Sequence, residues 1–100
     1  MREVILSKRA SQKLEELLQY LEKEWSEKAR DNFIKKLDKS FEQLKKFPES
    51  SMKSELKKGL YRCVVTKQTS VFYQFDEKSV KVVTIFDNRM DPEKLKTELK

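Results

Sequence analysis

The fold is decided by residues 56–92, which read LKKGLYRCVVTKQTSVFYQFDEKSVKVVTIFDNRMDP. This segment holds most of the β-branched and aromatic residues of the chain in one block, which is typical of strands. It predicts three strands separated by short polar gaps: Leu60–Lys67, Ser70–Asp76 and Val80–Phe86. Because such short gaps cannot hold a crossover between parallel strands, we expect an antiparallel meander.

The middle strand of this meander is predicted to separate two faces. Alternation along the strand places Val71, Tyr73 and Phe75 on one face. Phe72 and Gln74 fall on the other face. One face can therefore bury a core while the other stays partly exposed to solvent, and we expect the functional site on the exposed face.

Two amphipathic helices are predicted before the meander, from Lys8 to Trp25 and from Glu27 to Phe47. Apolar residues recur every three or four positions in both: Ala10, Leu14, Leu17, Leu18, Leu21 and Trp25, then Ala29, Phe33, Leu37, Phe41, Leu44 and Phe47. Ser7 and Ser26 are the predicted N-caps, and Pro48 ends the second helix. We expect the two helices to form a hairpin whose apolar stripes, Trp25 included, face the sheet.

The remaining segments complete an α+β fold. Glu3–Leu6 is a short apolar run that predicts a first strand beside the meander, at a position that the pattern leaves open. A polar connector, residues 48–59, ends at Gly59, the only glycine, where we expect a backbone conformation closed to other residues. Asp91–Glu93 predicts the start of a short helix anchored by Leu95 and Leu99. The order β-α-α-β-β-β-α predicts a single domain, residues 1–100, with a mainly antiparallel sheet of about four strands.

Positive charge is concentrated in one part of the sequence. The chain has 23 Lys and Arg against 17 Asp and Glu, a net charge of +6. Between positions 45 and 67 the basic residues are Lys45, Lys46, Lys53, Lys57, Lys58, Arg62 and Lys67, and the acidic ones are Glu49 and Glu55. Two interpretations stay open, a surface for an acidic partner and a solvated lysine face that serves solubility.

Composition excludes several classes of function. Cys63 is the only cysteine and lies in a strand pattern, so we interpret it as a small core residue. The absence of histidine removes most zinc and Cys–His chemistry and leaves the serine triad without its usual base, and no metal or cofactor is predicted. No apolar segment is long enough to span a membrane or to act as a signal peptide, so we expect a cytoplasmic protein without a membrane partner.

The candidate site residues are four cations on or beside the meander: Lys57, Lys58, Arg62 and Arg89. Tyr61 and Tyr73 are expected to be available for stacking. Such a set could hold RNA phosphates and stabilise the pentacovalent phosphorus that forms when a 2′-hydroxyl cleaves the chain. It could equally bind an acidic peptide.

The layout resembles the RelE/ParE superfamily of toxins from bacterial type II toxin–antitoxin modules. The resemblance covers essentially the whole chain and rests on the helix ending in Trp25, the helix closing at Phe47-Pro48, the Gly59-Leu60-Tyr61-Arg62 strand entry, the Val71-Phe72-Tyr73 strand core, and Arg89-Met90-Asp91-Pro92 after the last strand. It implies a growth-inhibiting toxin, as in plasmid stabilization, and a cognate acidic antitoxin as partner. Lys57, Lys58 and Arg62 are the residues that we expect to contact this antitoxin.

RelE-like members of the superfamily cut messenger RNA on the ribosome. They use an arginine on the central strand, basic residues before the meander, a second arginine after the last strand, and a tyrosine or histidine near the C-terminus. This sequence has Ser70 and Leu95 at the first arginine and tyrosine positions, whereas Arg89 matches the second arginine. Lys57 and Lys58 lie near the basic segment. The resemblance therefore implies at most a reduced ribonuclease constellation, and leaves open whether the protein is an enzyme.

ParE-like members lack that catalytic set and poison DNA gyrase. The segments LYRCVVTKQTSVFY and RMDPEKL are more similar to these members. The resemblance thus favours a toxin that acts on DNA gyrase, with a ribosome-dependent mRNA endoribonuclease as the alternative. A third interpretation keeps the fold without toxicity, as a basic domain that binds nucleic acid or a partner protein.

Overall fold

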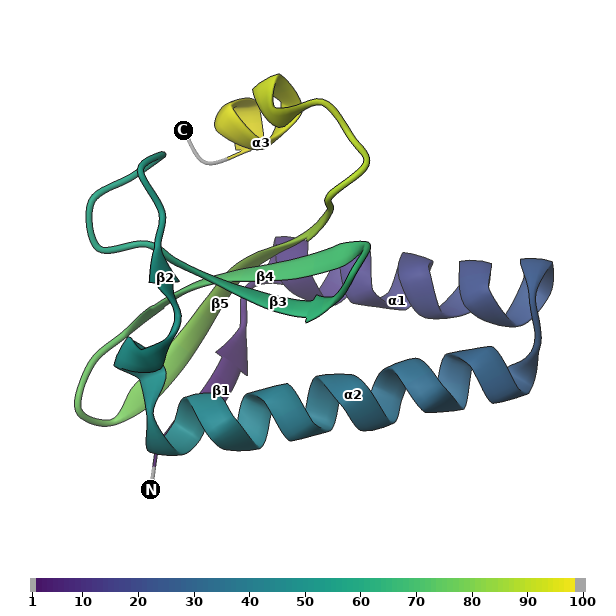
Figure 1. The fold of residues 1–100 in the computed structure, drawn as a ribbon, viewed down its shortest axis with the longest axis horizontal. Helices are drawn as coiled ribbons and strands as arrows, with labels where there is room; N and C mark the ends of the chain where they lie inside the picture. Colours follow the sequence, from purple (N-terminus) through teal and green to yellow (C-terminus); the bar gives the residue numbers. More distant parts are fainter. Residues whose placement is uncertain (1, 99–100) are drawn as a thin grey trace.

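The structure, a computed structural model, describes residues 2–98 and confirms the predicted order of elements (Figure 1). The elements are β1 (Glu3–Leu6), α1 (Lys8–Glu24), α2 (Glu27–Lys46), the 3-10 turn η1 (Pro48–Ser50), β2 (Met52–Lys53), β3 (Tyr61–Thr66), β4 (Thr69–Phe75), β5 (Ser79–Asp87) and α3 (Pro92–Glu98). The α+β class is confirmed. The sheet has five strands instead of about four, because the polar connector contributes β2.

The strands are ordered β1-β5-β4-β3-β2. The predicted antiparallel meander is formed by β3, β4 and β5, with β4 at the centre of the sheet. β1 lies at one edge and runs parallel to β5, with Val4 opposite Val80. Ser7, between β1 and α1, ties the start of α1 to β5, because its hydroxyl accepts a hydrogen bond from the Ala10 amide at 2.9 Å and donates one to the Val83 carbonyl at 2.7 Å.

The helical hairpin covers one face of the sheet, as predicted (Figure 1). The core between the two layers contains Ala10, Phe33, Leu37, Leu44, Val71, Tyr73, Val80, Val82 and Ile85. Phe41 is partly buried against this core. The Ser26 hydroxyl caps α2 by accepting a hydrogen bond from the Ala29 amide at 3.0 Å. The prediction that the apolar stripes of both helices pack against the sheet is therefore confirmed for these residues.

Two aromatic residues of these stripes are not in the core, and the prediction was wrong for them. Trp25 is 72% exposed and Phe47 is 57% exposed. Trp25 caps α1 at the tip of the hairpin, which extends beyond the end of the sheet in Figure 1, so no strand lies beneath it. Phe47 caps α2, and it is the following residue, Pro48, that is buried.

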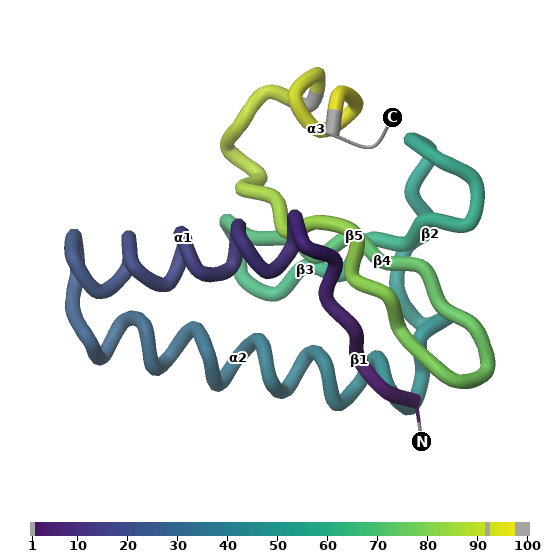
Figure 2. Tube along the Cα trace, turned by 180° about the vertical axis from the view of Figure 1, so that it is seen from behind, coloured from purple at the N-terminus to yellow at the C-terminus, as the bar shows by residue number. Residues whose placement is uncertain are grey.

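The opposite face of the sheet carries a second, smaller core. Figure 2 shows α3 and the β2–β3 loop, residues 54–60, on this side of the sheet, away from α2. Leu60, Phe72, Phe86 and Leu95 are buried here together. The predicted alternation of β4 is thus confirmed, since Phe72 faces away from the helices. Leu99, the second predicted anchor of α3, lies outside the described residues.

A β-bulge in β5 decides which of its residues reach this second face. Phe72 pairs with Thr84. The next residue of β4, Tyr73, pairs with Val82, so Val83 is an extra residue on β5. Beyond the bulge, the even-numbered residues of β5 point away from the helices, whereas before it they point towards them.

The β2–β3 loop is closed by hydrogen bonds and by its glycine. The Ser54 amide donates to the Leu60 carbonyl at 2.7 Å, and the Leu60 amide donates to the Lys57 carbonyl at 3.2 Å. Gly59 has a φ of +80°, which confirms the expected conformation. The loop therefore has a defined path over the second core. Within residues 2–98, no helix is long and apolar enough to cross a membrane.

Candidate functional site

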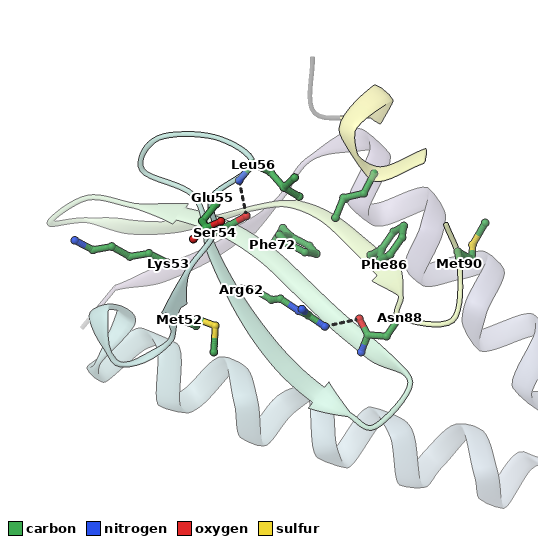
Figure 3. Close-up of a pocket in the computed structure, with 11 residues that line it drawn as sticks. Met52, Lys53, Ser54, Glu55, Leu56, Arg62, Phe72, Phe86, Asn88 and Met90 are labelled. Carbon is green, nitrogen blue, oxygen red and sulfur yellow. Dashed lines mark hydrogen bonds between the residues drawn. The ribbon is translucent and has the colours of Figure 1, made fainter. Parts of the chain in front are cut away.

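Arg62 on β3 points to the face opposite the helices, where two side chains hold its guanidinium. Its Nε donates a hydrogen bond to Ser70 Oγ at 3.0 Å. Its Nη2 donates to Asn88 Oδ1 at 3.0 Å, the bond that is marked in Figure 3. The Ser70 hydroxyl donates to the same Asn88 oxygen at 2.8 Å. The guanidinium carbon also lies 6.0 Å from the centre of the Phe72 ring. Arg62 therefore occupies one defined position above β4.

Asn88 fixes this arrangement from the end of β5. Its backbone amide donates to the Gln68 carbonyl at 2.7 Å, and its Nδ2 donates to the Lys67 carbonyl at 3.4 Å. Asn88 thus connects the β3–β4 turn to the guanidinium of Arg62. Both acceptors of the guanidinium, Ser70 Oγ and Asn88 Oδ1, are neutral. Among the residues that the structure describes, no carboxylate forms an ion pair with Arg62.

A pocket of about 380 Å³ lies beside Arg62, between the β2–β3 loop, the sheet and α3 (Figure 3). Six apolar side chains line it: Met52, Leu56, Phe72, Phe86, Met90 and Leu95. Arg62 and Asn88 supply polar groups inside the pocket, and the exposed residues Lys53 and Glu55 border it. The pocket is therefore mainly apolar with one partly buried cation.

The structure does not bring the four predicted cations together. Lys57 and Lys58 are exposed on the β2–β3 loop and do not line the pocket. Arg89 is exposed and forms an ion pair with Asp87, with Nη2 and Oδ2 2.9 Å apart. Hydrogen bonding in this pair raises the pKa of Arg89 and lowers the pKa of Asp87. Arg62 and Arg89 thus line two different hollows.

The two tyrosines expected beside the cations lie on the other face of the sheet. Tyr73 is completely buried beneath the helices, and Tyr61 is partly buried next to it, with ring centroids 5.7 Å apart. Tyr61 pairs directly with Tyr73 across β3 and β4, so both rings face the helices. Arg62, one residue later, faces away from them. The expectation that these tyrosines are available for stacking was wrong.

Three further predicted positions are buried or partly buried. Ser70 is fully buried and hydrogen bonded to Arg62, and Leu95 is 4% exposed in the second core. These are the positions at which the resemblance to RelE-like members would place an arginine and a tyrosine. Cys63 is partly buried against the helix-facing core, and this burial raises the pKa of its thiol. Asn88 was not predicted, because a lone asparagine after a strand is most often a turn residue.

A second hollow lies between the far part of the helical hairpin and the β3–β4 turn. It has a volume of about 880 Å³. Tyr20, Trp25 and Met90 line it and are exposed, and Arg89 stands at the same groove. This groove and the pocket at Arg62 meet at Met90, which lines both.

Solved structures with the same fold include toxin–antitoxin proteins. A structure described as "Chromosomal ParDE TA system from P. aeruginosa" superposes with a TM-score of 0.71 at 11% identity, over 87% of this chain and 96% of that chain. The structure of YafQ from E. coli strain BL21(DE3) superposes with a TM-score of 0.53 at 15% identity, over 89% of this chain and 96% of that chain. At these identities the similarity establishes the fold.

The family is established by sequence. No curated protein shows a significant match to the chain. A family model described as "ParE toxin of type II toxin-antitoxin system, parDE" matches residues 4–92, from β1 to the start of α3. The match spans most of the chain and agrees with the resemblance noted from its segments. The chain therefore belongs to the ParE toxin family of type II toxin–antitoxin systems.

Proposed function

We propose that the protein inhibits bacterial growth by acting on DNA gyrase, and that a cognate acidic antitoxin neutralises it. The observation that carries this proposal is that the side chains of Ser70 and Leu95 are both buried and neither can catalyse RNA cleavage. A ribonuclease of the RelE type would need an arginine and a proton-transfer group at these positions. Here one position is a buried hydroxyl that orients Arg62, and the other is a buried core leucine.

Cleavage of RNA by its own 2′-hydroxyl needs a group that takes up a proton and donors that stabilise the phosphorus. Arg62 can supply donors. Glu55 is the lining residue that can accept a proton, but it is exposed, and no hydrogen bond within residues 2–98 orients its carboxylate. The pocket is therefore better suited to binding than to RNA cleavage.

Two features support a disordered acidic peptide as the neutralising partner. Lys57 and Lys58 are exposed beside Arg62's strand and can attract acidic residues over a distance. β2 pairs only with Tyr61 and Arg62, so the outer edge of β3 from Cys63 to Thr66 has no strand partner in the described part of the chain. An extended peptide can add a strand at such an edge and fold as it binds.

The target is tested by expressing the protein alone in a bacterium. We expect growth arrest, inhibition of supercoiling by purified gyrase, and intact messenger RNA in primer-extension assays. Cleavage of messenger RNA with normal gyrase activity would instead identify a RelE-like ribonuclease, and Glu55→Gln should then reduce the cleavage. Normal growth at a matched level of folded protein would identify a basic binding domain without toxicity.

The partner is tested with the product of the adjacent short reading frame. Co-expression should restore growth and yield a complex. The association rate should fall as salt rises, because steering between opposite charges is screened over about 8–10 Å at physiological ionic strength. The absence of a complex, or an association rate that does not respond to salt, would contradict the role of the cations in neutralisation.

A further inference from the structure

We propose that Arg62 receives one carboxylate of the antitoxin, and that an apolar side chain next to this carboxylate fills the pocket beside Arg62. This inference rests on the proposed neutralisation by an acidic antitoxin and specifies its central contact. The occupant is a protein segment in which an Asp or Glu stands beside a bulky apolar residue.

The first argument is the unbalanced charge of Arg62. The guanidinium has five N–H donors. Nε and Nη2 donate to Ser70 and Asn88, while Nη1 makes no hydrogen bond to the described residues. A partly buried cation without a counter-ion has lost hydration and gained little in return. A carboxylate that binds in the forked geometry of the guanidinium supplies the missing charge and hydrogen bonds.

The second argument is that Arg62 is already in position. Asn88 is held by the β3–β4 turn, and Ser70 is fully buried on the central strand. A side chain that is fixed before binding loses little conformational entropy when its partner arrives, so more of the interaction energy appears as affinity. Ser70 and Asn88 are thus positioning residues for Arg62.

The third argument is the apolar surface around the cation. Met52 is 76% exposed, Met90 is 42% exposed and Leu56 is 37% exposed, and all three line the pocket. Three exposed apolar side chains around one pocket indicate a contact with an apolar partner group. An acidic residue flanked by an apolar one satisfies both halves of this site, whereas an acidic residue alone leaves the apolar half in water.

The same residues argue against a nucleic acid as the occupant. Phe72 and Phe86 form the floor of the pocket, and both are buried, with their rings edge to face and centroids 6.4 Å apart. No face of these rings is open for a base to stack on, as single-stranded nucleic acids require.

Binding kinetics with the purified product of the adjacent reading frame test the contact. Arg62→Gln and Lys58→Gln each remove one positive charge, but only Arg62 lines the pocket. Arg62→Gln should accelerate dissociation roughly 30-fold or more, as expected when a partly buried charge pair is broken. Lys58→Gln should slow association and weaken its salt dependence while dissociation stays unchanged. Equal dissociation rates for the wild type and Arg62→Gln would overturn the proposal.

Asn88→Asp separates binding from folding. The new carboxylate would lie where Asn88 Oδ1 now accepts from Arg62 at 3.0 Å, so it would balance the charge of Arg62 within the toxin. Asn88→Asp also removes the 3.4 Å hydrogen bond from Asn88 Nδ2 to the Lys67 carbonyl, but the new ion pair with Arg62 should outweigh this long bond. We therefore expect an unchanged or higher melting temperature together with faster dissociation of the antitoxin. A purely structural role of Asn88 predicts that stability and affinity change in the same direction, and that result would count against the proposal.

Double-mutant cycles identify the carboxylate. Each Asp and Glu in the C-terminal half of the antitoxin is changed to Asn or Gln and combined with Arg62→Gln. One position should couple with Arg62, and coupling spread evenly over all positions would contradict a single receptor. A single-stranded RNA oligonucleotide is then tested as a competitor of the antitoxin. If it competes with the wild type but not with Arg62→Gln, the ligand of Arg62 is a phosphate chain, and the proposed peptide occupant is wrong. A complex without Arg62 dependence refutes only this inference, whereas the absence of any complex refutes the proposed neutralisation.

Discussion

The phenol of Tyr73 donates a hydrogen bond to the carbonyl oxygen of Pro48, which ties the central strand to the turn that ends α2. Both residues are fully buried. We expect Tyr73→Phe to lower the free energy of unfolding by about 1–3 kcal/mol, because the buried carbonyl loses its donor. Denaturant unfolding measures this change. Tyr61→Phe is the matched control, and an equal loss in both variants would argue against a special role of the Tyr73 hydrogen bond.

The same tyrosine makes stability depend on alkaline pH. Burial raises the pKa of Tyr73 to about 12, from a usual value of 10.0. The folded state therefore binds the phenol proton more tightly than the unfolded state does. The resulting contribution to the free energy of unfolding is complete below pH 10 and is lost as the pH rises from 10 to about 12. The difference in unfolding free energy between wild type and Tyr73→Phe should narrow over this interval. A difference that stays constant up to pH 12 would contradict the assignment.

Leu44 and Trp25 should respond very differently to truncation. Leu44 is 1% exposed in the helix-facing core, so Leu44→Ala should destabilise the protein by about 2–5 kcal/mol. Trp25 is at the overhanging tip of the hairpin, and Trp25→Ala should change stability by less than about 0.5 kcal/mol. Thermal unfolding of the two variants is the measurement. If Trp25→Ala lowered the stability clearly more than this, the tip of the hairpin would have to be packed against another surface.

Gly59 should be sensitive to substitution through its backbone alone. A Cβ built at this position has no atom within 4 Å, but φ is +80°. We therefore expect Gly59→Ala to cost about 1–2 kcal/mol, and Gly59→Asn to cost less, because asparagine adopts positive φ more readily. The melting temperatures of the two variants give this order. The reverse order would indicate that the loop changes its path.

The proposed toxicity should depend on the two arginines near the sheet and not on the cysteine. Arg62→Ala and Arg89→Ala should weaken growth arrest with unchanged circular dichroism spectra, because arginine can hold a carboxylate or phosphate with two hydrogen bonds. Cys63→Ser should leave growth arrest unchanged if the protein folds. Arg30→Ala is a control, since Arg30 pairs with Glu22 on the helical hairpin. Full toxicity of both arginine variants would mean that neither Arg62 nor Arg89 takes part in the growth arrest.

Local patterns were sufficient for most elements, because each helix and strand of the meander carries its own periodicity. They could not reveal that Trp25 is exposed, since this depends on the length of the hairpin relative to the sheet. β2 has two residues and exists through its pairing with Tyr61 and Arg62, not through local propensity. The same limit applied to the site. That Asn88 meets Arg62 is a consequence of strand register over 26 positions, which no short segment encodes.

The bulge at Val83 also determines where this protein can change its length. Since Val83 is the additional residue, its deletion would leave every other residue of β5 on the face that it has now. If another residue of β5 were deleted and the bulge at Val83 were kept, the residues between the deletion and the bulge would move to the opposite face of the sheet. An insertion between Thr84 and Phe86 that no bulge takes up would shift the register and turn Phe86 and Asn88 towards the helices. A one-residue deletion in this strand should therefore be tolerated at Val83, at the cost of the contacts that Val83 makes. A one-residue deletion or insertion that shifts the register elsewhere in the strand should disrupt the pocket beside Arg62.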